Sequence, residues 1–177
     1  MKRIFLSALL CGVLIDAGAQ HIVNPGRMAI NIDLLDARGN KQNLPLGHKV
    51  TAVFYTDPDA KDVINPLSEA MEKRKLPKDK FIGVGVINCK DTWVPNSAMK
   101  ISVRQKEKQS PGSVILFDEN KALAKEWSLG DCNNACVLVI VGMDSRVKYA
   151  KAIRSQEECR AAMGAIMKLL EEEIGKS

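Results

Sequence analysis

The sequence predicts an α/β fold in which a central mixed sheet carries helices on both faces and an N-terminal β-hairpin. Apolar, strand-like runs alternate with helix-like segments through the middle of the chain, two later strands follow one another without a helix, and a long amphipathic stretch ends the chain. Helices between central strands favour parallel crossovers, and the late strand pair favours an antiparallel edge. With 177 residues, 46% of them hydrophobic, the chain can bury one core, so we expect one domain.

Residues 1–19 show the order of features of a secretory signal peptide. Two basic residues follow the initial methionine, residues 4–15 are an apolar stretch too short to span a bilayer, and an A-x-A cleavage site ends at Ala19. Cleavage there would leave Gln20 as the new N-terminus and residues 20–177 as a single domain. We therefore expect an exported protein, in the periplasm of a Gram-negative cell, with no stable membrane insertion after removal of the signal.

The N-terminal part of this domain should form a hairpin and the first central strand. Residues 30–34 alternate between apolar and polar, and residues 37–40 have the composition of a hairpin turn. Residues 50–56 are a continuous apolar run, which is typical of a strand covered on both faces. A helix should follow, with Pro66 near its first turn. Its apolar stripe consists of Val63, Leu67, Ala70 and Met71.

The rest of the chain continues the alternation. A second buried strand covers residues 81–87 and a third covers residues 113–117, with a helix between them. A short helix over residues 122–127 then leads to a hairpin of strands 137–141 and 146–150. The apolar positions expected on the helix between the second and third strands are Met99, Ile101 and Val103.

The last helix has the clearest signals. Ser155 and Glu158 form a capping box at its start. Its apolar stripe consists of Cys159, Met163, Ile166, Met167, Leu170 and Ile174. The order of all elements, a hairpin followed by β-α-β-α-β-α-β-β-α, is that of a thioredoxin-like sandwich. Trp93 and Trp127 are expected to anchor loops onto its core, unless Trp93 is exposed and marks a partner surface.

The turn after the first central strand is informative because it lacks cysteine. A thioredoxin-like reductase carries Cys-x-x-Cys there, with the first thiol at a helix N-terminus that lowers its pKa. Asp59 and Asp62 occupy roughly these places, and no cysteine stands near Val63, where a peroxiredoxin would need one. We interpret Asp59 as the helix cap and Asp62 as a complement to the helix dipole. The alternative is a carboxylate pair for acid–base chemistry or metal binding.

Four cysteines remain after removal of the signal, and the sequence leaves their pairing open. Cys132 and Cys136 are close enough in sequence to form a structural disulfide across a bent loop, which an oxidising compartment favours. They would also suit a reactive dithiol, with Cys132 as nucleophile and Cys136 as resolving thiol, or they are unpaired or paired elsewhere. Cys159 should be a buried thiol, and a bridge between it and Cys89 is not expected.

The charge pattern argues against nucleic acid as a partner. The net charge of +5 is dispersed, and the basic residues near position 75 are interleaved with acidic ones without accompanying aromatics. The two histidines, His21 and His48, have no zinc-site spacing to the cysteines, and no glycine-rich loop follows a strand in phosphate-binding form. We therefore expect no cofactor and no metal site.

Three short segments carry a resemblance to a known family. They are residues 75–81, 124–129 and 144–151. With these segments in this order and spacing, the chain from about residue 26 to residue 170 resembles the YtfJ family of bacterial periplasmic proteins. The resemblance implies a thioredoxin-like fold and a periplasmic location, and the family has no settled biochemical activity. The resemblance adds little to function. Because the turn after the first central strand lacks Cys-x-x-Cys, we expect a role in binding an unknown envelope protein or small ligand. The alternative is a thiol–disulfide oxidoreductase that uses Cys132 and Cys136.

Overall fold

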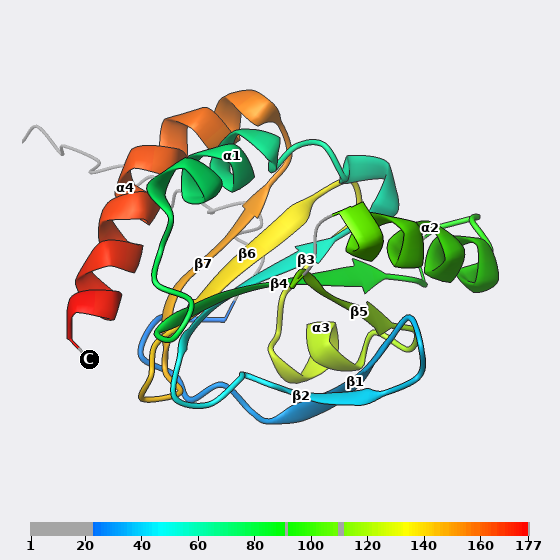
Figure 1. The fold of residues 1–177 in the computed structure, drawn as a ribbon, viewed down its shortest axis with the longest axis horizontal. Coiled ribbons are helices and arrows are strands. Elements are labelled where there is room, and N and C mark those ends of the chain that lie inside the picture. The colour runs from blue at the N-terminus through cyan, green and yellow to red at the C-terminus, as the bar shows by residue number, and fades with distance from the viewer. Residues whose placement is uncertain (1–22, 91, 110–111, 177) are drawn as a thin grey trace, which may run out of the picture.

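The computed structural model describes residues 23–90, 92–109 and 112–176, so the predicted signal peptide and its cleavage site lie outside the described residues. The chain forms one seven-stranded sheet with helices packed on it (Figure 1). The strands are β1 (Ile32–Asp36), β2 (Lys41–Leu44), β3 (Val50–Thr56), β4 (Phe81–Asn88), β5 (Val114–Asp118), β6 (Cys136–Val141) and β7 (Val147–Ile153). The helices are the 3₁₀ turn η1 (Pro58–Ala60), α1 (Asn65–Arg74), α2 (Asn96–Gln109), α3 (Ala122–Glu126) and α4 (Gln156–Gly175). Among the described residues, no helix has both the length and the apolar character that crossing a membrane requires.

The strand order confirms the predicted fold class. The sheet runs β2-β1-β5-β4-β3-β6-β7, with β3, β4 and β5 parallel. The β1–β2 and β6–β7 hairpins form antiparallel edges, and Tyr55 of β3 lies opposite Val137 of β6. One connection differs from the expectation of parallel crossovers between central strands. Helix α3 leads from β5 into β6, which runs antiparallel to β3.

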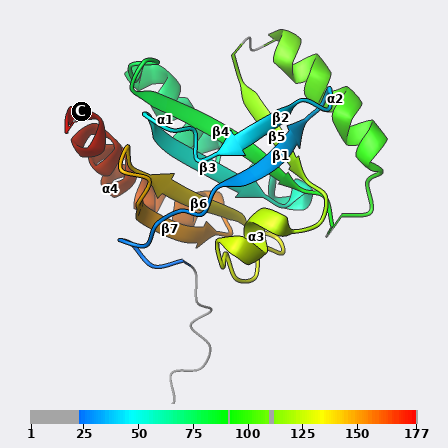
Figure 2. The same cartoon turned by 90° about the horizontal axis from the view of Figure 1, so that it is seen from below.

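Helices cover both faces of the sheet unequally. α1, α2 and α4 lie over one face, and α3 lies over the other together with the segment that precedes β1 (Figure 1, Figure 2). Leu67 of α1 and Ile166 and Leu170 of α4 fill the core of the first face. Leu123 and Trp127 fill the core of the second face. All six residues of β6 are buried, because this strand contributes side chains to both cores.

The start of α4 follows the predicted cap with one change. Ser155 Oγ accepts the N–H of Glu158 at 3.1 Å, as an N-cap should. The Glu158 carboxylate accepts the N–H of Arg154 at 2.7 Å, one residue before the donor that a capping box uses. The cap therefore also fixes the backbone at the corner between β7 and α4.

Two large apolar side chains that we predicted to pack on the core, those of Ile101 and Trp93, are exposed. Ile101 is 58% exposed, because it stands off the stripe through which α2 packs on the sheet. That stripe consists of Met99 and Val103. Trp93 is 86% exposed, so it does not anchor its loop as expected. Trp127 is buried as predicted, and its indole N–H donates to the carbonyl oxygen of Ile30 at 2.8 Å.

Candidate functional site

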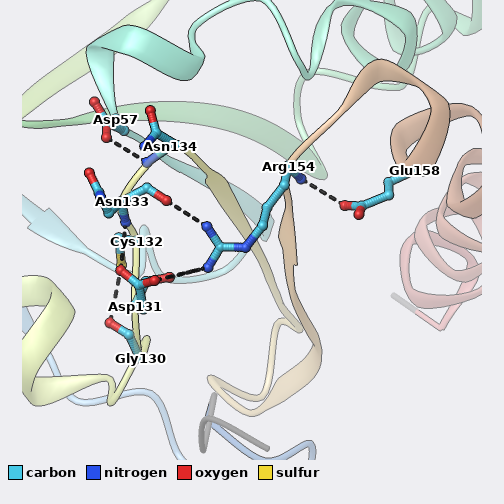
Figure 3. A network of polar contacts seen from close by, with 8 residues as sticks. All are labelled: Asp57, Gly130, Asp131, Cys132, Asn133, Asn134, Arg154 and Glu158. Atoms are coloured by element: carbon cyan, nitrogen blue, oxygen red, sulfur yellow. Dashed lines mark hydrogen bonds and ion pairs between the residues drawn. The ribbon is translucent and has the colours of Figure 1, made fainter. Parts of the chain in front are cut away.

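The carboxyl end of β3, the loop before β6 and the corner between β7 and α4 lie close together at one end of the sheet's strands (Figure 3). Thr56, the last residue of β3, pairs with Cys136, the first residue of β6. The turn that follows Thr56 is the place where the sequence lacks the redox cysteines of the fold. Strand pairing therefore brings this turn beside the loop of residues 131–135.

Asp57 ties the turn to the loop. Its side chain is fully buried, and one carboxylate oxygen accepts the N–H of Asn134 at 2.7 Å. The other oxygen accepts the N–H of Asp59 at 3.0 Å, and the Asp57 N–H donates to the carbonyl of Ala135 at 3.0 Å. A carboxylate leaves water at a large free-energy penalty unless charge-assisted hydrogen bonds replace its hydration, and two backbone donors do so here.

The expected roles of Asp59 and Asp62 as helix cap and dipole complement are wrong. Asp57 is the N-cap of η1, with Pro58 in its first turn, and α1 begins only at Asn65, without a side-chain cap. The additional 3₁₀ turn moves the cap two residues toward the N-terminus. Asp59 and Asp62 are both exposed, and the Asp62 side chain contacts the Asn65 amide at 3.5 Å.

Arg154 holds the same loop from the other side (Figure 3). Its guanidinium donates to the carbonyls of Asn133 at 2.5 Å and Asp131 at 3.1 Å, and it forms an ion pair with the Asp131 carboxylate at 3.3 Å. Asn134 has a positive φ of 49°, a conformation that asparagine tolerates better than most residues. The loop is thus turned at Asn134 and clamped between two charged side chains.

The four described cysteines are free thiols, and all are buried. Cys136 points into the core beneath α1 and α4, whereas Cys132 belongs to the core on the opposite face of the sheet. The bridge between them that the sequence left open is therefore not formed. Cys159 is buried, as expected, and shares the core of Cys136, while Cys89 packs under α2.

Burial makes three of these thiols, those of Cys89, Cys136 and Cys159, poor nucleophiles. It raises the pKa of Cys136 to about 12, although Thr56 Oγ1 contacts the sulfur at 3.2 Å. Burial, followed by the charges of Glu119 and Asp118, raises the pKa of Cys89 to about 11. Burial also raises the pKa of Cys159. Because the thiolate is the reactive form, these three groups are protonated and inert at neutral pH.

Comparison with known families assigns the chain. Residues 38–171 match the family described as "Bacterial protein of unknown function (YtfJ_HI0045)". The chain belongs to this YtfJ family. A relative is the uncharacterized protein YtfJ of Escherichia coli strain K12, which is 31% identical over 114 residues. The match covers 63% of this chain and 60% of the E. coli protein, so the chain spans less than two thirds of that relative.

Solved structures share the fold of this YtfJ-family chain. A thiol peroxidase from Chromobacterium violaceum has a TM-score of 0.62 at 14% identity, covering 89% of this chain and 90% of the peroxidase. A thiol:disulfide interchange protein DsbE from Chlorobium tepidum, so named provisionally, has a TM-score of 0.59 at 14% identity, with coverages of 84% and 99%. At these identities the likeness concerns the fold, which is thioredoxin-like.

Sequence reasoning missed Asp57, Asn134 and Arg154. An aspartate that follows a strand and precedes a proline is a good N-cap signal, because proline is favoured in the first helical turn. That signal would have identified Asp57. Nothing in the sequence pairs Asn134 or Arg154 with the turn, since each lies at least 75 residues away and only the β3–β6 register brings them together. Across the described part of the chain, no group of three or more histidine, cysteine or acidic side chains is placed to hold a metal ion.

Proposed function

We propose that this YtfJ-family chain is exported to the periplasm and acts by binding another molecule, not by thiol–disulfide exchange. The proposal of export rests on residues 1–19, whose basic start, apolar stretch and small-residue site have the order of a signal peptide. Edman sequencing of the protein from a fractionated cell envelope tests it. We expect a periplasmic protein that begins at Gln20, and a cytoplasmic protein with residues 1–19 intact would overturn the proposal.

The observation that favours a binding role over thiol exchange is the buried Asp57 carboxylate directly after β3. Thiol exchange needs an accessible thiolate at this end of the strands, stabilised by free backbone N–H groups. The N–H groups of Asp59 and Asn134 are already bonded to Asp57. The sequence has no Cys-x-x-Cys at any position. The redox activities named for the solved relatives are therefore not proposed for this chain.

The alternative, an oxidoreductase with Cys132 and Cys136, is disfavoured by the placement of the two thiols. Their side chains lie in cores on opposite faces of the sheet, and Cys136 is fully buried. Forming a disulfide between them would require β6 to detach at its first residue, where Thr56 pairs with it.

An insulin-reduction assay with dithiothreitol distinguishes the two functions. We expect the purified protein to leave the rate of insulin precipitation at the protein-free level, before and after alkylation. Turnover that disappears in Cys132→Ser and persists in the matched control Cys159→Ser would establish the oxidoreductase instead. A thiol count supplements the assay. We expect four free thiols in the native protein, whereas a disulfide reducible near about −270 mV would favour redox chemistry.

A further inference from the structure

Helices α1 and α4 lie side by side over one face of the sheet (Figure 1). Residues of both helices line a groove along the seam between them. At the start of α4, the groove is open to solvent and has a volume of about 500 Å³, with Ala70 and Met163 among its lining residues. A second stretch of about 510 Å³ shares Ala70 with the first and passes Gly164. A third stretch of about 450 Å³ shares Arg74 and Glu171 with the second, so the three adjoin one another in a single open groove along the seam.

The middle of this groove is lined by two small residues, Ala70 of α1 and Gly164 of α4, beside longer side chains. Gly164 lies in the interior of α4 and is exposed, and a Cβ built there would meet no atom within 4 Å. Glycine in a helix interior makes the helix less stable than alanine would. Because a Cβ at position 164 would meet no atom, packing among the described residues does not explain why a glycine stands there. Close approach of another backbone to α4 would give such a reason. Met163 and Met167 flank the glycine, are half-buried, and offer an adaptable apolar surface.

The rim of the groove is basic. Six basic and two acidic side chains line its three stretches. The basic residues are Lys73, Arg74, Lys75, Lys80, Arg160 and Lys168. Two of the basic side chains already have acidic partners, because Arg74 pairs with Glu171 across the groove at 2.5 Å and Lys168 pairs with Glu172 at 3.8 Å. The groove therefore presents a positive rim around an apolar floor.

We propose that this groove binds an acidic amphipathic helix of a partner protein, an inference that rests on the binding role proposed above. The ten residues of α1 span about 15 Å, which matches two to three turns of a bound helix. Carboxylates on that helix meet the basic rim, and small or apolar side chains pack on the methionines and against Gly164. A concave seam between two helices admits a chain segment, whereas a flat anionic bilayer would touch only the rim.

Binding of a labelled peptide to the full chain tests the proposal. The probe is a fluorescein-labelled helical peptide of about 14 residues, with leucine and alanine on one face and glutamate on the other. A peptide with lysine in place of glutamate is its control. We expect the acidic peptide to bind, to weaken as salt rises, and to shift NMR signals of α1 and α4. The double variant Lys73→Glu/Lys168→Glu should weaken binding at least about tenfold. The matched pair Lys106→Glu/Lys108→Glu, exposed on α2, should change it less than about twofold.

A second variant separates binding from folding. Gly164→Leu fills open space on a helix, so its melting temperature should be unchanged or higher, while peptide binding should fall at least about tenfold. The inference is overturned if the acidic peptide does not bind up to about 1 mM, or if the α2 pair weakens binding as much as the groove pair. Unchanged binding by Gly164→Leu, or preferential binding to phosphatidylglycerol vesicles, would also overturn it. A redox-active protein that still binds the peptide would refute the proposed function alone, and an inert protein that does not bind it would refute this inference alone.

Discussion

Replacing Asp57 by alanine tests whether its carboxylate joins the turn after β3 to the loop before β6. The substitution removes two acceptors from a fully buried position and leaves the N–H groups of Asp59 and Asn134 without them. The lost N-cap is worth about 1 kcal/mol. The bond from Asn134 to a charged acceptor is worth about 1.5–3 kcal/mol, and burial makes the orphaned donor harder to satisfy with water. We therefore expect the free energy of unfolding to fall by about 3–5 kcal/mol.

Urea unfolding followed by circular dichroism measures this loss, and two variants control for it. Asp57→Asn keeps one acceptor oxygen and should lose about half as much. Asp59→Ala changes an exposed residue and should stay within about 0.5 kcal/mol of the parent. Hydrogen exchange at the Asn134 amide should accelerate in Asp57→Ala. A loss below about 1 kcal/mol, or an equal loss in Asp59→Ala, would refute the assignment of Asp57 as cap and clamp.

Four further predictions follow from single residues. Gly164→Ala should raise the free energy of unfolding by about 1 kcal/mol in urea, because alanine favours the helix and its Cβ enters open space. Gly142→Ala should lower it by about 1–2 kcal/mol in the same assay, since its Cβ would overlap Lys148 Cε, come within 2.8 Å of Asp144 Oδ1, and disturb the ion pairs of Lys148 with Asp144 and buried Glu173. The pKa of Cys136 rises from 9.0 to about 12 on folding, so the unfolded chain loses this proton first, and Cys136 alone should lower stability from about pH 9 upward by at most ~1.4 kcal/mol per pH unit. Cys136→Val should remove this contribution and leave those of Cys89 and Cys159. Iodide should quench the fluorescence of Trp93 and spare that of Trp127, and a Trp93→Phe variant that remains fully quenchable would contradict the structure.

The sequence was most informative where one physical signal dominated. The bounds of β3 were predicted to the residue, because a continuous apolar run ends directly before Asp57-Pro58, which cannot continue a central strand. The long periodic stripe of α4 and its Ser155 cap were equally clear. The cap of the preceding turn was misplaced because a single 3₁₀ turn, η1, leaves no periodic signal of its own. Hydrophobic spacing identifies a helix but locates its first residue poorly.

The cysteines illustrate a different limit. Spacing of Cys132 and Cys136 along the chain says nothing about which side of the sheet each thiol faces. The turn at Asn134, held by Asp57 and flanked by the contacts of Arg154, sends the two side chains into separate cores. Those contacts join residues from three distant parts of the chain, so only the folded register reveals them.

The Asp57–Asn134 contact and the open groove between α1 and α4 together indicate where a partner would bind this chain. Any ligand that entered between the β3 turn and the β6 loop would have to separate Asp57 from Asn134 and leave a buried carboxylate short of a donor. Such a step opposes binding by about 1.5–3 kcal/mol before any contact is made. The groove between α1 and α4 imposes no comparable penalty, because its middle is already open and a Cβ at Gly164 meets nothing. A partner would therefore bind at lower cost on the helical layer than between the β3 turn and the β6 loop, which predicts that Asp57→Asn leaves peptide binding unchanged while Gly164→Leu weakens it at least about tenfold.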